Sequence, residues 1–118
     1  NSELIAYCDW SFESAKIMTL RLLARNPEVD GIFAANDTMA LGAIAAIQER
    51  GRKVPDEISV VGFDDSIIAQ THRPGVTTVR QDIVGLGAAA AETMIALLQD
   101  REPEVSMLPT EIVIRETA

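Results

Sequence analysis

Four short polar clusters in this 118-residue chain could do chemistry, and each follows a predicted strand. They lie at residues 8–10, 36–37, 64–65 and 80–82. The carboxyl ends of parallel strands meet at one edge of a sheet, and open α/β sheets bind their ligands beyond that edge. We therefore expect the four clusters to converge and to form a small-molecule site.

The side chains in these clusters suit a hydroxyl-rich ligand. The indole of Trp10 can cover the apolar face of a sugar ring or stack on a flat heterocycle. Asn36 offers both a donor and an acceptor, and one carboxylate of residues 64–65 can accept hydrogen bonds from hydroxyls. Structural alternatives remain open, since Trp10 could be a half-buried core aromatic, Asn36 could cap a helix and Gln81 could lie in solvent.

The same residues argue against an enzyme. The side chains of Asp64 and Asp65 should point apart on an extended chain, whereas the two carboxylates of a glycosidase flank one bond. No serine has an evident relay of histidine and aspartate, and no phosphate-binding loop is present. The sequence holds one histidine, His72, and one cysteine, Cys8, which cannot form a recognisable zinc site. We therefore predict no catalytic residue, no metal and no cofactor.

The elements that would position the clusters alternate between strands and helices. Strands are predicted at residues 4–7, 31–35, 58–63, 76–79 and 112–114, and helices are predicted from Ser11 or Ser14, from residues 36–37 and over residues 82–99. Segment 31–35 is apolar throughout, which is typical of a strand buried on both faces. The alternation predicts an α/β fold with a parallel, doubly wound sheet.

Composition narrows the class of protein further. The length suits one compact domain, and the formal net charge of −8 repels phosphate backbones, so we expect no direct contact with nucleic acid. No apolar run reaches the ~20 residues that span a bilayer, and no signal peptide is visible. A single cysteine fits a reducing compartment, so we expect a cytoplasmic location without membrane contact. The opening without methionine suggests that the chain begins inside a longer protein.

Four segments resemble the lactose/galactose repressor family. They read IFAANDTMALGA over residues 32–43, VPDEISVVGFDD over 54–65, TTVRQ over 77–81 and LPTEIVIRE over 108–116, and the similarity extends over essentially the whole chain. The resemblance implies a periplasmic-binding-protein-like core of type I with two lobes and an effector between them. It implies that this chain is a truncated C-terminal lobe.

The resemblance also divides the chain into three parts. Residues 1–81 would belong to the C-terminal lobe, residues 82–108 would be a crossover segment and a helix of the other lobe, and residues 109–118 would be a final strand and tail.

By the same resemblance the chain senses a small-molecule effector within a transcriptional repressor. The implied effector-binding residues are Trp10, Asn36, Asp64 and Gln81. Trp10 favours a sugar or sugar derivative as the effector over a purine. A homodimer is implied, with an interface that includes Phe12, Leu41, Thr71 and His72.

Operator DNA would be contacted only through a helix-turn-helix headpiece that is absent from this chain. The alternative function is an extracytoplasmic sugar-binding receptor of a transport system, which shares the fold. The segment 54–65 and the ending Arg115-Glu116 are more similar to repressors.

Overall fold

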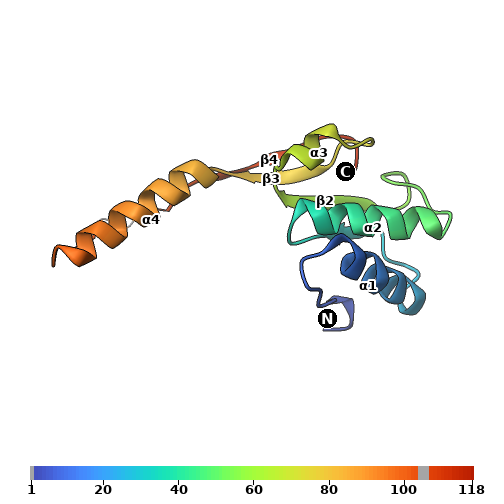
Figure 1. Ribbon diagram of the computed structural model, residues 1–118. Coiled ribbons are helices and arrows are strands. Elements are labelled where there is room, and N and C mark those ends of the chain that lie inside the picture. The colour runs from blue at the N-terminus through green and yellow to red at the C-terminus, as the bar shows by residue number, and fades with distance from the viewer. Residues whose placement is uncertain (1, 104–106) are drawn as a thin grey trace.

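The computed structural model describes residues 2–103 and 107–118 (Figure 1). Its elements, in chain order, are the 3-10 turn η1 (Ser2–Leu4), α1 (Phe12–Arg25), β1 (Gly31–Phe33), α2 (Asp37–Glu49), β2 (Ser59–Asp64), α3 (Ile67–Thr71), β3 (Thr77–Gln81), α4 (Ile83–Leu98) and β4 (Thr110–Val113). Residue 1 of the predicted lobe 1–81 and residues 104–106 of the predicted segment 82–108 lie outside the described residues. The division of the chain at residue 82 stays a prediction.

The strands form one four-stranded sheet in the order β1-β2-β3-β4. β1 and β2 run parallel, and so do β2 and β3, in which Gly62 lies opposite Thr78. β4 returns after α4 and pairs antiparallel with β3, where Val113 lies opposite Thr78. The predicted α/β fold with an open, mainly parallel sheet is confirmed. The antiparallel direction of β4 differs from the predicted parallel sheet, because a short apolar pattern carries no information on strand direction.

The core lies between the sheet and a layer of helices. α2 packs on β2, and α1 packs beside α2 (Figure 1). Because side chains alternate across a strand, Val60 and Gly62 face α2 while Val61 and Phe63 face the other way. The most deeply buried apolar side chains come from α2, β2 and the segments next to them: Ala40, Ile44, Ala46, Ile47, Ile58, Val60, Ala69 and Val76.

Two glycines permit the closest contacts of α2. A Cβ atom at Gly42 would overlap the backbone carbonyl oxygen of Phe12 and would lie 3.0 Å from the Cβ atom of Ala15. A Cβ atom at Gly62 would overlap the carboxylate of Asp37. A side chain at either position would therefore push α2 away from α1 or from β2.

Capping residues begin and end the helices as the sequence predicts. Of the two candidate serines, Ser11 caps α1, since its side chain accepts a hydrogen bond from the backbone N–H of Ser14. Asn36 caps α2 by accepting a hydrogen bond from the N–H of Met39 at 2.7 Å. Gly51 follows α2 with a φ of +72°, the left-handed conformation expected of a glycine after a helix.

The predicted strand at residues 4–7 is wrong. η1 covers the start of this segment, and the described structure has no strand before α1. Among the described residues β1 pairs only with β2, so its other edge has no strand from residues 4–7 beside it. Side chains of this segment nevertheless alternate between a pocket and solvent. Ala6 and Cys8 line a pocket beside β1, whereas Tyr7 is 85% exposed.

The prediction that residues 31–35 are buried on both faces is also wrong. β1 spans only three residues at the edge of the described sheet, and Phe33 is 65% exposed. An apolar run shows that both faces suit a buried environment, but whether both are covered depends on neighbours elsewhere in the chain. Among the described residues, α2 covers one face only.

The segment after β4, at the end of the chain, connects β2 to β3. The side chain of Thr117 is fully buried and donates a hydrogen bond to the carbonyl of Val60 at 2.7 Å. It also accepts a hydrogen bond from the N–H of Thr77 at 2.9 Å, and its own carbonyl accepts one from the N–H of Val60. Thr117 therefore bridges β2 and β3 just before their ladder begins.

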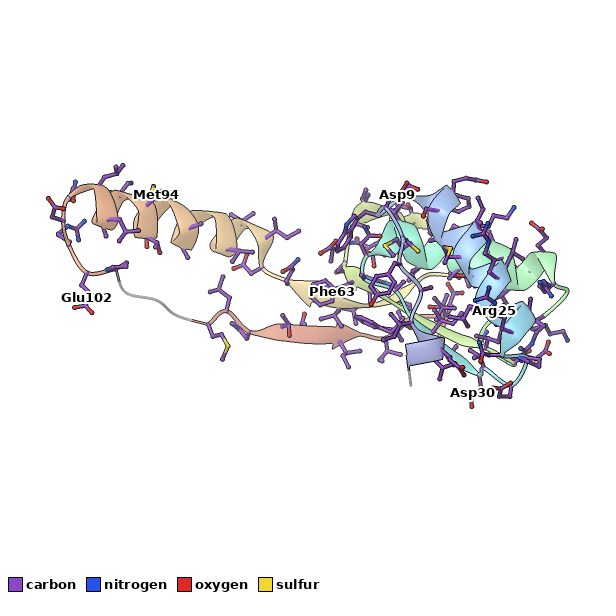
Figure 2. The ribbon with its side chains drawn as sticks, turned by 90° about the horizontal axis from the view of Figure 1, so that it is seen from below. Asp9, Arg25, Asp30, Phe63, Met94 and Glu102 are labelled. Carbon is purple, nitrogen blue, oxygen red and sulfur yellow. The ribbon has the colours of Figure 1, made fainter. Side chains whose placement is uncertain are left out.

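α4 projects away from the rest of the molecule (Figure 1). The structure measures 57 Å along its longest axis and 28 Å and 22 Å across. α4 agrees with the predicted helix over residues 82–99, yet Ala96 is its one buried residue. Figure 2 shows its side chains, including that of Met94, pointing outward without another helix beside them. No described helix is long and apolar enough to span a membrane.

Candidate functional site

Three of the four polar clusters lie at the carboxyl ends of the parallel strands β1, β2 and β3, as predicted. The cluster at residues 8–10 follows no strand and lies just before α1. β2 ends at Asp64 and β3 ends at Gln81, and the parallel pairing brings these ends together. β1 leads into Asn36, the cap of α2. Trp10 precedes α1 and contacts Asn36. The four predicted residues therefore form two pairs at one edge of the sheet.

The first pair joins Trp10 to Asn36. The Nδ2 atom of Asn36 donates a long hydrogen bond of 3.5 Å to the backbone carbonyl of Trp10. Trp10 has a φ of +69°, and its side chain is 64% exposed, so its indole remains accessible to a ligand. The predicted alternative of a half-buried core aromatic is excluded, whereas the capping role of Asn36 is confirmed and coexists with its contact to Trp10.

Asp9 stabilises the turn that carries Trp10. Its Oδ1 atom accepts hydrogen bonds from the backbone N–H of Ser11 at 3.1 Å and from the Ser11 hydroxyl at 2.6 Å. These hydrogen bonds from Ser11 hold the pKa of Asp9 below its ordinary value. The carboxylate therefore stays charged and keeps the turn in place before the first residue of α1.

The second pair joins Asp64 to Gln81. The Nε2 atom of Gln81 donates a hydrogen bond of 2.7 Å to Oδ1 of Asp64. Gln81 is therefore not a free solvated side chain. Its amide carbonyl and the carboxylate of Asp64 together offer several acceptor sites for hydroxyl groups.

Asp65 makes ion pairs that the sequence did not predict. Its side chain is only 3% exposed, and its two oxygens lie 2.6 Å from Nε of Arg80 and 2.5 Å from Nη2 of Arg115. Burial raises the pKa of Asp65, but the hydrogen bonds and charges of Arg115 and Arg80 outweigh burial and hold it below its ordinary value. The hydrogen bond to Asp65 also raises the pKa of Arg80, which pairs with Glu111 at 2.6 Å as well.

Asp37 is a second buried carboxylate behind the site. Its side chain accepts hydrogen bonds from the Thr78 hydroxyl at 2.6 Å and from the N–H and hydroxyl of Ser66, both at 2.7 Å. Its residue is 1% exposed. Asp37 connects the start of α2 to β3 and to the turn after β2. The sequence indicated only that Asp37 or Asn36 caps the helix, since hydrogen bonds across 29 and 41 residues leave no local pattern.

An open pocket of about 620 Å³ lies beside the second pair. It is lined by the turn of Asp64 and Asp65, by Arg80 and Gln81, by the start of α4 and by residues 109–111. Trp10 and Asn36 are outside its lining. The structure thus brings the two pairs to one edge without enclosing them in a common cavity.

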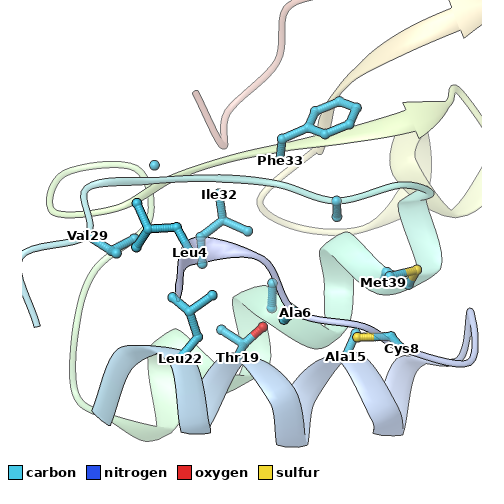
Figure 3. A pocket seen from close by; sticks show the side chains of 13 residues that line it. Leu4, Ala6, Cys8, Ala15, Thr19, Leu22, Val29, Ile32, Phe33 and Met39 are labelled. Carbon is cyan, nitrogen blue, oxygen red and sulfur yellow. The ribbon is translucent and has the colours of Figure 1, made fainter. Parts of the chain in front are cut away.

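A smaller apolar pocket of about 260 Å³ lies between α1 and β1 (Figure 3). Leu4, Ala6 and Cys8 line it from one side, and Thr19 and Leu22 of α1 line it from another. Cys8 is half-buried there and packs as a small hydrophobic side chain. In residues 2–103 and 107–118, no three histidine, cysteine or acidic side chains gather as metal ligands.

The residues predicted at a dimer interface lie on the helical layer. Phe12 and Leu41 belong to the adjoining helices α1 and α2, and α3, which ends at Thr71, contacts α2. The Nδ1 atom of His72 lies 2.9 Å from the carbonyl of Pro74, which holds the ring against its own loop. An interface through these residues stays a prediction.

The whole chain is similar to known regulators. The model of the periplasmic binding protein-like domain matches residues 5–118. The HTH-type transcriptional regulator CelR of Thermobifida fusca is 34% identical over 116 residues, covering 97% of this chain and 34% of that protein. The ribose operon repressor of Halalkalibacterium halodurans is 33% identical over 118 residues, covering 98% and 36%. The chain spans about a third of the length of these relatives.

Solved structures agree with the sequence comparison. A complex of the transcriptional regulator CelR with cellobiose superposes with a TM-score of 0.93 at 33% identity, covering all of this chain and 37% of that one. A lac repressor dimer bound to operator and the anti-inducer ONPF gives a TM-score of 0.85 at 36% identity, covering 93% and 34%.

Proposed function

Because the chain belongs to the periplasmic binding protein-like domain family, and its relatives are regulators of the lactose/galactose repressor type, we propose that it senses an effector within a transcriptional repressor. The effector is a sugar or sugar derivative. It binds at the carboxyl edge of the sheet, against Trp10, Asn36, Asp64 and Gln81.

The observation that carries this proposal is that these four residues come together in two contacting pairs at one edge of the sheet. The exposed indole of Trp10 provides a flat apolar surface for the face of a sugar ring, and the Asn36 amide reaches the backbone carbonyl of the same residue. The Asp64–Gln81 pair provides acceptors for hydroxyl groups. The complex of the relative CelR with cellobiose supports a sugar as the ligand class.

The net charge of the chain supports contact with DNA through another segment of the full-length protein. A chain with a net charge of −8 has little attraction for phosphates, so operator DNA is contacted by a helix-turn-helix headpiece outside these 118 residues. The protein acts in the cytoplasm as a homodimer, and it is not an enzyme. The regulatory relatives favour this function over an extracytoplasmic transport receptor.

A ligand screen on the full-length protein tests the proposal. A ligand that binds only the folded state raises the thermal midpoint, by about 2.7 kcal/mol of stabilisation at a hundredfold excess over Kd. We expect cellobiose, lactose or a related sugar to raise the midpoint and to change the tryptophan fluorescence, to which Trp10, the one tryptophan of these 118 residues, contributes. If purines and not sugars raise it, the ligand class is wrong.

Asp64→Ala identifies the site. We expect the variant to lose the sugar response while it keeps operator binding, because lost hydrogen bonds to a ligand cost about 1–3 kcal/mol. Asp56→Ala is the matched control, since Asp56 is an exposed aspartate near the opposite end of β2. An unchanged sugar response in Asp64→Ala, measured by operator affinity with and without the sugar, would refute the assignment.

Leu41→Lys tests the dimer. Charge on the half-buried Leu41 of α2 should shift the full-length protein from dimer to monomer in analytical ultracentrifugation. A dimer that persists in this variant at low concentration would contradict an interface through α2.

A further inference from the structure

Backbone strain is concentrated at the candidate site. Four described residues other than glycine have a positive φ, and three of them are Trp10, Asp64 and Asp65. Asp64 has a φ of +102° and Asp65 a φ of +53°, so two successive residues adopt a region that L side chains rarely occupy. Such a conformation persists only where the surroundings impose it, and it clusters where ligands bind.

The carboxylate of Asp65 is the first group that imposes this conformation. It accepts a hydrogen bond from Nε of Arg80 at 2.6 Å and one from Nη2 of Arg115 at 2.5 Å, one on each oxygen. Both partners come from other parts of the chain, 15 and 50 residues away. The 3% exposure of the Asp65 side chain keeps water from replacing them.

Arg115 has fixed contacts of its own. Its Nη1 atom donates to the carbonyl of Val76 at 2.8 Å, and its backbone N–H donates to the Thr77 hydroxyl at 2.9 Å. The guanidinium therefore stands at a set position beside the start of β3 and presents Nη2 to Asp65. A lysine could supply the charge, but its single ammonium could not reproduce both side-chain bonds in the same plane.

Ser66, the next residue of the turn, is held by Asp37 at the start of α2. The N–H and the hydroxyl of Ser66 both donate to the buried Asp37 at 2.7 Å. Asp65 and Ser66 are thus held by β3, by the segment after β4 and by the start of α2. Asp64 lies between this held turn and the end of β2, and its carboxylate reaches Gln81.

We infer that Asp65 is a positioning residue for the proposed effector site, and that Arg115 acts through it. The ion pair of Asp65 with Arg115 holds the strained turn, and the turn directs the carboxylate of Asp64 toward Gln81 and the pocket. The inference rests on the proposed function for the ligand, but the conformation of Asp64 can be measured without any ligand.

A purely structural ion pair would behave differently from a positioning one. Removing a structural pair lowers the stability of the fold and leaves the affinity of the folded protein for its ligand unchanged. Removing a positioning pair changes the backbone at Asp64 and weakens binding. Arg52 supplies the comparison, because it also pairs with a carboxylate, Glu57, and donates to backbone carbonyls, but near the opposite end of β2.

The experiment uses Asp65→Asn, Arg115→Gln, Arg115→Lys and Arg52→Gln in the full-length protein. Crystal structures of the variants without ligand give the φ of Asp64, and calorimetry at a temperature where each variant is folded gives the Kd for cellobiose. We expect Asp65→Asn and Arg115→Gln to move Asp64 out of the positive-φ region and to weaken binding by about tenfold or more. We expect Arg115→Lys to recover part of the affinity and Arg52→Gln to bind like the parent protein.

Two results would overturn the inference. One is an unchanged φ at Asp64 in Asp65→Asn and Arg115→Gln, whatever their affinity. The other is an equal loss of affinity in Arg52→Gln, which would mean that any lost ion pair has the same effect. If the parent protein binds no sugar or sugar derivative in the ligand screen, the proposed ligand class fails, while the φ of Asp64 in the variants still decides the role of Asp65.

Discussion

α2 and α4 are both rich in apolar residues, yet one is the most buried helix of the molecule and the other the most exposed. α2 buries seven of its thirteen residues between α1 and β2. α4 has sixteen residues, most of them apolar, and Leu86, Met94, Ile95 and Leu97 are all half exposed or more. Apolar composition therefore shows that a helix needs a partner, whereas the topology of the chain decides whether a partner is within reach.

The difference between the two helices leads to a first prediction, on self-association. Burying a leucine or methionine side chain is worth about 1.5–3 kcal/mol, so the exposed apolar side chains of α4, among them Leu86, Met94 and Leu97, should bind the same side chains of a second copy of this 118-residue chain. Light scattering across a dilution series should show oligomers that dissociate on dilution. Leu86→Lys combined with Met94→Lys should remove this association and leave at most the dimer proposed through α2, and a strictly monomeric parent chain would contradict the prediction.

A matched pair of isoleucines compares the contribution of each helix to stability. Ile44→Ala in α2 should lower the free energy of unfolding by about 2–5 kcal/mol, because it removes a fully buried side chain. Ile95→Ala in α4 should change it by less than about 0.5 kcal/mol, because Ile95 is half exposed. Urea unfolding at low protein concentration measures both, and equal losses would mean that α4 packs against the rest of the molecule.

A matched pair of glycines extends the comparison to the backbone. Gly42→Ala should destabilise the chain by about 1–3 kcal/mol, because the new methyl group would overlap the Phe12 carbonyl. Gly87→Ala should instead stabilise α4 by about 0.5–1 kcal/mol, since nothing lies within 4 Å of its added Cβ. Thermal unfolding followed by circular dichroism separates them, and effects of the same sign would show that the helices do not differ in packing.

The smallest expected effect is that of pH on stability, through the carboxylate of Asp65. Burial raises the pKa of Asp65, but Arg115 and Arg80 lower it more, so its pKa when folded lies below the unfolded value of about 3.9. The contribution of Asp65 is therefore complete above about pH 3.9 and is lost as the pH falls through the lower, folded value. Asp65→Asn should remove this part of the acid destabilisation. A parental slope of stability against pH in the variant would contradict it.

The body of the fold could be predicted because its signals are local. Ser11, Asn36 and Gly51 mark helix ends through contacts within a few residues, and the alternation of strands and helices indicates a parallel sheet. The edge where Asn36, Asp64 and Gln81 gather follows from that topology alone. Their roles as ligand contacts rest on the resemblance and stay predictions.

The features that sequence reasoning missed depend on distant neighbours. The strand at residues 4–7 and the burial of residues 31–35 failed because each needs a partner that the described chain does not supply. α3 spans five residues, too few for a helical period to emerge. The ion pairs of Asp65 join it to Arg80 and Arg115, which lie 15 and 50 positions further along the chain, and the sequence gives no sign of these partners.

Thr117 has a consequence for the order in which the fold can be completed. Its contacts reach back 40 residues to Thr77 and 57 residues to Val60, and they supply the backbone of both strands with partners inside the core. During synthesis β2 and β3 leave the ribosome long before residue 117 does, and loops of that length close slowly. Until Thr117 is synthesised, the N–H and carbonyl of Val60 and the N–H of Thr77 therefore lack these partners, and in this interval the unfinished sheet is most exposed to aggregation and to chaperones.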